Sequence, residues 1–183
     1  MRVRLKLAVL RAAKVLRQGG LLAHQTGTLA GIAGHPNSIG KIQRFKQREG
    51  PFLLLADSLR SAYKQARYIT PALRKLAKQS WPGAVTLVFA GKPSLPNSCY
   101  QQGMMALRVD GSEETRYLAK LCGGLLVSSS LNRRGKPVMA IKRQQRYRYS
   151  RWITACLPSK EPCGEQKPSR IYRLRGSQNL RLR

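Results

Sequence analysis

Acidic residues and histidines are scarce in this 183-residue chain. Only 7 Asp and Glu stand against 35 Lys and Arg, and the two histidines are His24 and His35. The sequence shows no obvious Ser-His-Asp or paired-carboxylate constellation, which argues against the common forms of acid–base and nucleophilic catalysis. Two isolated imidazoles offer too few ligands for a metal ion, so we predict no metal site and place both histidines in loops or at strand ends.

Closely paired cysteines and long apolar runs are missing as well. The four cysteines have neither the short paired spacing of a zinc site nor the density of a disulfide framework, which favours a reducing compartment. No apolar stretch reaches the roughly 20 residues needed to span a bilayer. The N-terminal segment keeps Arg11, Lys14 and Arg17 on its polar face, so no signal-peptide core forms. We therefore expect a cytoplasmic protein with no membrane contact.

A formal net charge of +28 dominates the surface chemistry. Such a field concentrates polyanions, above all RNA, and binding of that kind weakens steeply as the salt concentration rises. Near the C-terminus Tyr147, Tyr149 and Trp152 alternate with arginines, a pattern that suits stacking on RNA bases. Two alternatives stay open: solvated Lys and Arg with no particular partner, and an amphipathic surface element whose rings face inward.

Length and a hydrophobic content of 42% predict one globular domain over residues 1–183. Apolar runs of strand length alternate with segments of helical periodicity, and Ser, Thr, Pro and Gly mark their boundaries. The predicted strands are 21–23, 52–56, 85–89, 105–109 and 125–127. The predicted helices are 5–16 and four that begin near 37, 58, 70 and 112, and 91–103 is a predicted loop. This alternation indicates an α/β protein with a single twisted mixed β-sheet and helices packed on it.

Two polar clusters follow predicted elements of this fold, Lys46-Gln47-Arg48 and Ser128-Ser129-Ser130-Leu131-Asn132. The first ends an amphipathic helix, and the second ends a buried strand. Cations held near a hydroxyl and an amide bind phosphate or carboxylate oxygens through charge-assisted hydrogen bonds, roughly twice as strong as neutral ones. A nucleotide site is therefore indicated. Solvated cations at the negative end of a helix dipole are the simpler alternative for Lys46 and Arg48.

Four motifs in order resemble those of the YrdC-like family of threonylcarbamoyl-AMP synthases, in its short single-domain bacterial form. They are Lys46-Gln47-Arg48 for K-x-R, residues 81–86 for W-P-G-P-x-T, residues 106–109 for A-x-R-x, and residues 127–132 for V-S-T-S-A-N. The resemblance runs nearly end to end and implies the YrdC-like fold. It also implies a nucleotidyltransferase that condenses L-threonine, bicarbonate and ATP into threonylcarbamoyl-AMP with release of pyrophosphate, for the threonylcarbamoyl modification of tRNA.

The resemblance further implies a role for each matching residue. The catalytic cations would be Lys46 and Arg48. The ATP-binding residues would be Lys46, Arg48 and Asn132, and the threonine-binding residues would be Thr28, Arg108, Ser130 and Ser169. Arg108 would hold the threonine carboxylate with its planar fork, and a terminal family arginine that reaches ATP corresponds to Arg181 or Arg183. No tightly bound cofactor is implied, because ATP is a substrate, and Mg²⁺ is compatible with ATP.

Segment 25–32 departs most from the family pattern. It is Gln-Thr-Gly-Thr-Leu-Ala-Gly-Ile where the family has P-T-[DE]-T-V-Y-G-L, so Gly27 stands in place of an acid and Ala30 in place of an aromatic side chain. Two further hypotheses therefore stay open. One is a non-catalytic RNA-binding protein on the same scaffold, acting in ribosome or tRNA maturation. The other is a site that keeps the nucleotide and takes a different amino acid.

Overall fold

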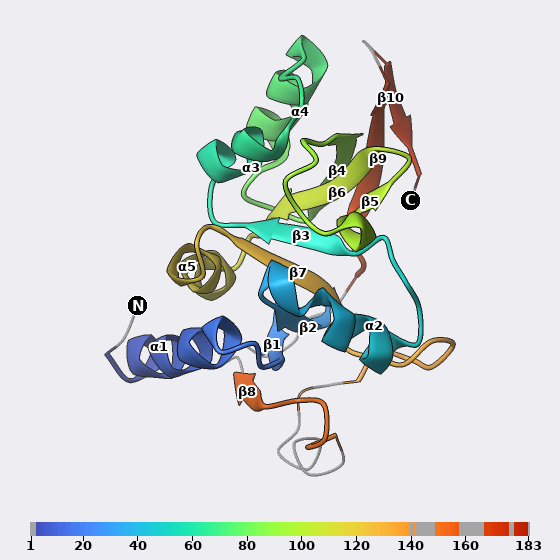
Figure 1. Ribbon diagram of the computed structural model, residues 1–183. Helices are drawn as coiled ribbons and strands as arrows, with labels where there is room; N and C mark the ends of the chain where they lie inside the picture. The colour runs from blue at the N-terminus through green and yellow to red at the C-terminus, as the bar shows by residue number, and fades with distance from the viewer. Residues whose placement is uncertain (1–2, 140, 142–148, 158–166, 176–177, 183) are drawn as a thin grey trace.

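A computed structural model describes residues 3–139, 141, 149–157, 167–175 and 178–182 of the chain (Figure 1). Its helices are α1 (Val3–Arg17), α2 (Ile39–Lys46), α3 (Leu59–Gln65), α4 (Pro71–Ser80) and α5 (Glu113–Leu121), with short 3₁₀ turns η1 (Pro36–Ser38) and η2 (Asn97–Cys99). Its strands are β1 (Leu22–Gln25), β2 (Ala30–Gly34), β3 (Leu53–Ala56), β4 (Val85–Ala90), β5 (Tyr100–Gln101), β6 (Met104–Val109), β7 (Leu125–Ser130), β8 (Ala155–Leu157), β9 (Arg170–Arg175) and β10 (Gln178–Arg181).

All the strands of the described residues belong to one mixed sheet, in the order β10-β9-β4-β6-β3-β7-β2-β1-β8, with β5 paired to β6. The pairs β3–β6, β4–β9 and β1–β8 are parallel. The remaining neighbours are antiparallel. The C-terminal hairpin of β9 and β10 lies at one end of the sheet and β8 at the other (Figure 1). The α/β fold class predicted from the sequence is therefore confirmed.

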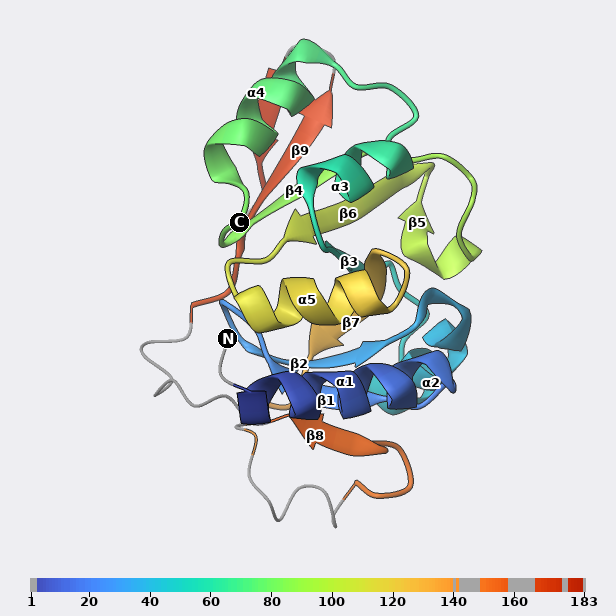
Figure 2. The same ribbon diagram turned by 90° about the vertical axis from the view of Figure 1, so that its left-hand side faces the viewer.

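Alternate residues of the central strands pack into two hydrophobic clusters. Leu55 and Leu126 join the cluster that contains α1 and α5, whereas Leu54 and Val127 join the cluster that contains α2, α3 and α4. This division follows because successive strand side chains point to opposite faces of a sheet. Helices α1 and α5 lie side by side (Figures 1 and 2), and Arg17 at the end of α1 donates to the Leu121 carbonyl at the end of α5 over 3.1 Å.

Side-chain caps fix the starts of three helices. The hydroxyls of Ser58, Thr70 and Ser112 accept the backbone N–H three residues later, over 3.2, 3.2 and 3.3 Å. Such a bond satisfies one of the N–H groups that a helix start leaves without a partner. Ser38 makes no such bond, because η1 precedes α2 and the His35 side chain accepts the Asn37 N–H instead.

Strands β2, β5, β8, β9 and β10 were not predicted from the sequence. Strand β5 and the turn η2 lie in the predicted loop 91–103. The sequence of β2, Ala-Gly-Ile-Ala-Gly, carries a single β-branched residue and therefore gives little strand signal. Its conformation comes from antiparallel pairing with β1 on one side and β7 on the other.

The predicted aromatic and basic element 142–152 lies mostly outside the described residues. Within its described part, the Tyr149 ring meets the Phe45 ring edge-on with centroids 5.9 Å apart. Trp152 also packs against the larger hydrophobic cluster. These two contacts favour the inward-facing alternative for both rings. Among the described residues, no helix is both long and apolar enough to cross a membrane.

Candidate functional site

A cavity of about 470 Å³ lies on one face of the sheet. Its floor contains one side chain from each of five adjacent strands at paired register positions: Arg173 on β9, Val88 on β4, Ala106 on β6, Leu53 on β3 and Ser128 on β7. Paired residues of neighbouring strands project to the same face. The row therefore places an apolar strip between a guanidinium at one end and a hydroxyl at the other.

Residues Lys46 and Arg48 come from the end of α2. The helix ends at Lys46, and Gln47 turns the chain with left-handed backbone angles (φ 54°). The Lys46 Nζ lies 2.8 Å from the Ser130 carbonyl oxygen, 2.5 Å from the Asn132 carbonyl oxygen and 2.6 Å from Asn132 Oδ1. The Ser130 hydroxyl donates to Asn132 Oδ1 over 2.6 Å. The two polar clusters, which lie more than 80 residues apart in the chain, thus meet in the structure.

These residues stand in different relations to the cavity. Arg48 and Ser130 line it, whereas Lys46 and Asn132 are not part of its lining and reach it through Ser130. The Arg48 guanidinium lies over the Phe52 ring, 4.6 Å from its centroid, a cation–π contact. Burial and then the nearby charge of Arg48 lower the pKa of Lys46 to about 8. No carboxylate belongs to the described lining, so this end of the cavity attracts anions.

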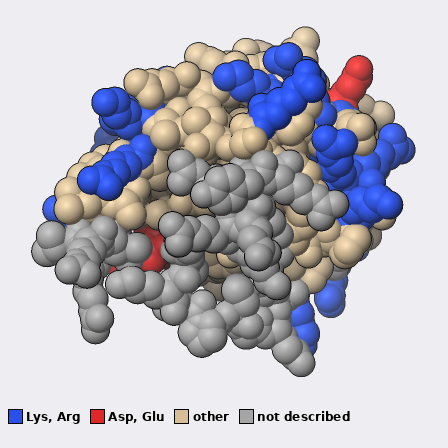
Figure 3. All heavy atoms as spheres, turned by 90° about the horizontal axis from the view of Figure 1, so that it is seen from below, with Lys and Arg blue, Asp and Glu red and all other residues tan. Residues whose placement is uncertain are grey.

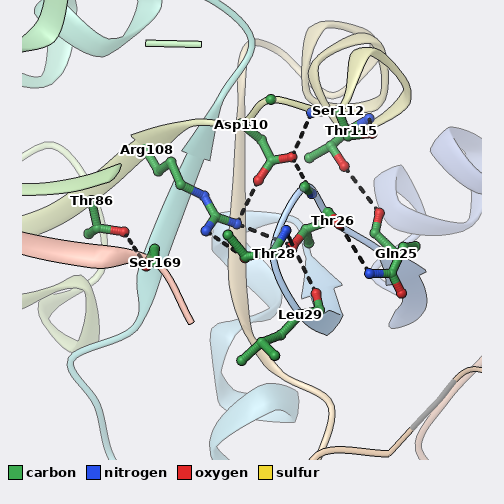
Figure 4. Close-up of polar contacts among 12 residues, drawn as sticks. Gln25, Thr26, Thr28, Leu29, Thr86, Arg108, Asp110, Ser112, Thr115 and Ser169 are labelled. Atoms are coloured by element: carbon green, nitrogen blue, oxygen red, sulfur yellow. Dashed lines mark hydrogen bonds and ion pairs between the residues drawn. The ribbon is translucent and has the colours of Figure 1, made fainter. Parts of the chain in front are cut away.

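Arg108 sits on β6 with only 2% of its surface exposed (Figure 4). Its Nη1 donates to Thr28 Oγ1 over 2.8 Å, and its Nη2 donates to Thr26 Oγ1 over 3.3 Å. The same Nη2 forms an ion pair with Asp110 Oδ2 at 2.6 Å. Protein oxygens therefore already engage both terminal nitrogens of the fork that the sequence assigned to a substrate carboxylate.

Ser169 precedes β9 and faces Thr86 of β4. Their hydroxyl oxygens lie 3.0 Å apart, both residues are buried, and both line the cavity (Figure 4). All the predicted threonine-side residues line this one cavity, namely Thr28, Arg108, Ser130 and Ser169. The cavity thus has a hydroxyl-rich region in addition to its cationic end.

Four residues of this region were not predicted from the sequence: Thr26, Thr86, Asp110 and Arg173. Thr26 and Thr86 lie inside motifs that the sequence comparison already used, and Asp110 directly follows one. Arg173 could be found from the sequence only as the residue two positions after Ile171 and four after Ser169. These alternate residues all line the cavity. The predicted terminal arginine is not located: Arg181 is exposed on β10 outside the cavity lining, and Arg183 lies outside the described residues.

His24 lies within β1 and is 1% exposed, and its Nε2 has no hydrogen-bond partner among the described residues. Burial lowers its pKa to about 4, against the attraction of Asp110. Between pH 6.5 and 4 the unfolded chain therefore binds a proton that the folded chain does not. We expect acidification through this range to lower the free energy of unfolding by about 3 kcal/mol, at about 1.36 kcal/mol per pKa unit.

The expected result for His24→Gln is that this part of the acid dependence disappears in urea titrations at a series of pH values. His35→Gln is the matched control, because it removes the other histidine and keeps His24, so the part of the acid dependence that belongs to His24 should remain. An equal acid dependence in wild type and His24→Gln would contradict the assignment.

Comparison with known proteins identifies the family of this chain. The family model Sua5/YciO/YrdC, described as "Telomere recombination", matches residues 14–183. Threonylcarbamoyl-AMP synthase of Nitrosococcus oceani is 28% identical over 153 residues, which cover 80% of this chain and 83% of that protein. P. abyssi Sua5 in complex with L-threonine superposes with a TM-score of 0.88 at 23% identity over 100% of this chain, which spans 55% of that Sua5 chain. E. coli YciO superposes with a TM-score of 0.84 at 20% identity over 98% of this chain and 89% of that chain.

The fold and the site define an α/β protein with a cation-lined, hydroxyl-rich cavity on one face of a mixed sheet. The chain belongs to the Sua5/YciO/YrdC family. The family predicted from the motifs is therefore confirmed, and the predicted enzyme class is that of the curated relatives, which carry the name of a nucleotidyltransferase.

Proposed function

We propose that this chain is a threonylcarbamoyl-AMP synthase. It would join L-threonine, bicarbonate and ATP to give threonylcarbamoyl-AMP, pyrophosphate and water, for the modification of tRNA in the cytoplasm. The name of the curated relatives supports this proposal. The observation that carries it is that a single cavity is lined by residues of both predicted sets, Arg48 on the nucleotide side and Thr28, Arg108, Ser130 and Ser169 on the amino-acid side.

The reaction needs positive charge more than it needs a general base. A carbamate oxygen must approach the α-phosphorus of ATP although both groups are anionic, and pyrophosphate then leaves, so catalysis consists largely of positioning and charge neutralisation. In this proposal Arg48 contacts the phosphates directly, and Ser130 lies on the amino-acid side next to them. Lys46 supplies further charge and orders Ser130 and Asn132 through its hydrogen bonds.

The apolar strip of the floor suits the base of the nucleotide. Val88, Ala106 and Leu53 offer a flat apolar surface next to the phosphate side. Arg173 ends the row, and a guanidinium there can stack on an aromatic ring or bind a polar edge. We propose Arg173 as the cation at the far end of the nucleotide, a role that the sequence assigned to Arg181 or Arg183.

The threonine side combines hydroxyls with a neutralised guanidinium. The hydroxyls of Thr28, Thr86 and Ser169 provide donors and acceptors for an amino acid, and Arg108 adds a positive end to this region. The ion pair with Asp110 offsets much of the Arg108 charge. In this proposal Arg108 acts on the threonine carboxylate mainly through the Thr28 hydroxyl that it orients.

A Mg²⁺ ion fits the proposed site only as a companion of ATP. The described lining holds no carboxylate, and the described residues hold no cluster of three His, Cys, Asp or Glu that suits a metal ion. Mg²⁺ commonly keeps several waters and binds substrate phosphates. The residues present therefore fit an ion carried by the ATP phosphates, where it would help to neutralise their charge.

Pyrophosphate release tests the proposal. With ATP and bicarbonate present, the purified chain should release pyrophosphate only when L-threonine is added, and omission of bicarbonate should stop the release. Serine, valine and alanine in place of threonine test the hypothesis of a changed amino acid. Absence of release with threonine, under conditions in which the Nitrosococcus oceani relative is active, would refute the proposed function.

A non-catalytic RNA-binding protein is the second candidate, and the charge favours it. Exposed basic side chains of α1 and α2 include Arg11, Lys14, Arg17, Lys41 and Arg44. On the face shown in Figure 3, Lys and Arg are spread over the described surface and acidic residues are few. RNA binding whose affinity falls steeply with salt, together with no ATP binding in calorimetry, would support this candidate over the synthase.

A further inference from the structure

Asp110 is a buried carboxylate beside the amino-acid side of the cavity, with 1% of its surface exposed. Its Oδ2 pairs with Arg108 Nη2 at 2.6 Å. Its Oδ1 accepts the backbone N–H of Gly27 over 2.7 Å and that of Ser112 over 2.9 Å (Figure 4). One carboxylate thus links β6, the turn between β1 and β2, and the start of α5.

The ion pair determines how Arg108 meets the two threonines of the turn. A guanidinium with 2% exposure would be costly without a counter-charge, and Asp110 supplies it. With Arg108 held in place, its Nη1 donates to Thr28 Oγ1 over 2.8 Å. The Thr28 oxygen is therefore an acceptor toward Arg108, and its own hydrogen remains to be donated elsewhere.

The hydrogen bonds of the Thr26 hydroxyl indicate where the Thr28 hydroxyl hydrogen is directed. The Thr26 hydroxyl donates to the Leu29 carbonyl over 2.8 Å. It also accepts from the Thr28 N–H over 3.1 Å and from Arg108 Nη2 over 3.3 Å, which uses both of its lone pairs. The Thr28 hydroxyl, 3.1 Å from that oxygen, meets an occupied acceptor there and has the cavity as its other direction. It is therefore set to donate to an acceptor on a ligand.

Gly27 makes the close approach of the turn to Asp110 possible. A Cβ atom at this position would lie 3.0 Å from Asp110 Oδ1 and 3.3 Å from the Ser112 nitrogen, so a side chain there would displace the turn or the carboxylate. The glycine and the aspartate therefore form one unit, in which the turn donates its amide directly to the carboxylate.

We propose that Asp110 is a positioning residue of the amino-acid subsite, an inference that rests on the proposed function. By holding Arg108 and the turn 26–28, Asp110 directs the Thr28 hydroxyl hydrogen at the carboxylate of the amino-acid substrate. Asp110 itself does not line the cavity and does not touch the substrate.

Asp110→Asn separates the two sides of this carboxylate. Asparagine keeps an acceptor oxygen for the Gly27 and Ser112 amides and replaces the oxygen that faces Arg108 with a donor. In calorimetry at saturating ATP analogue, we expect the Kd for L-threonine to rise about tenfold to a hundredfold, the range of a lost hydrogen bond to a charged group. The Kd for ATP should change less than about threefold, since Arg48 on the nucleotide side is not involved. Glu113→Gln is the matched control, because this exposed acid lies three residues further on and should leave both constants unchanged.

Gly27→Ala is a second, independent variant, and it decides the matter if Asp110→Asn fails to fold. It keeps every charge and displaces the turn from Asp110, so it should weaken threonine binding selectively as well. Threonine binding within about twofold of wild type in each folded variant would overturn the inference. Equal loss of threonine and ATP binding would overturn it too, because a purely structural role predicts that pattern. Wild type that binds threonine without releasing pyrophosphate would refute only the proposed function, whereas wild type that does not bind threonine would refute both.

Discussion

Threonine-dependent pyrophosphate release is expected to fall about a thousandfold in Arg48→Ala, the scale on which an electrostatic transition-state contact acts. Arg48 is the cation that lines the phosphate side of the cavity, and no carboxylate belongs to the described lining to offset it. Its guanidinium lies over the Phe52 ring, which needs no partner when the guanidinium is removed. The fold should therefore survive, and the measurement is kcat together with the thermal unfolding curve.

Arg44→Ala is the matched control for this variant. Arg44 lies in α2, four residues before Arg48, is exposed, and donates to the Gly40 carbonyl of its own helix over 3.3 Å. Its removal takes away the same charge without touching the cavity. A release rate in Arg48→Ala that stays within about tenfold of the rate in Arg44→Ala would remove Arg48 from the site.

A second large effect is expected for Lys46→Met, on turnover and stability together. Methionine keeps the apolar stem and removes the ammonium that lies within hydrogen-bonding distance of oxygens of Ser130 and Asn132. Leaving such acceptors without a donor costs about 1–3 kcal/mol, so the free energy of unfolding should fall by about 2 kcal/mol. Release of pyrophosphate should fall at least a hundredfold, since Ser130 and Asn132 lose their common anchor. Urea unfolding and the release assay measure the two effects.

Alkaline pH should reproduce the loss of activity in the wild type without the loss of stability. The pKa of Lys46 is lowered to about 8, so activity should fall reversibly as the pH rises through about 8. Between pH 8 and the ordinary value of 10.5 the unfolded chain holds the proton more firmly than the folded one, so the contribution of Lys46 to stability rises with pH. Lys41→Met is the control for Lys46→Met, because it removes the same charge from an exposed position of the same helix. An activity profile that stays flat up to pH 10 would contradict the role of the Lys46 charge.

Local signals explain how much of the fold could be predicted. Strand β4 was predicted as 85–89 and spans Val85–Ala90, and the caps at Ser58, Thr70 and Ser112 are as their sequences indicate. Apolar runs and capping residues act within a few residues, so one sequence suffices to find them. Strand β2 could not be found this way, because its conformation depends on strands to both sides of it.

The site likewise contains residues that contiguous motifs reveal and residues that only the folded chain brings to the cavity. Lys46, Arg48, Ser130 and Asn132 were grouped because they belong to contiguous motifs, and the structure brings them together. The part played by Asp110 depends on how the turn 26–28 folds onto β6, which no spacing along the chain reveals. Arg173 likewise reaches the cavity only through the register of β9 against β4.

The row from Arg173 to Ser128 has a consequence for when the protein can first hold a ligand. It needs β9 placed beside β4, which is made some eighty residues earlier. A chain still emerging from the ribosome therefore lacks one wall of its cavity until β9 has been made. Once that wall is in place, a ligand bound in the cavity would contact both β4 and β9 and so stabilise both strands against local unfolding. Addition of the ligand should therefore protect both strands from protease together.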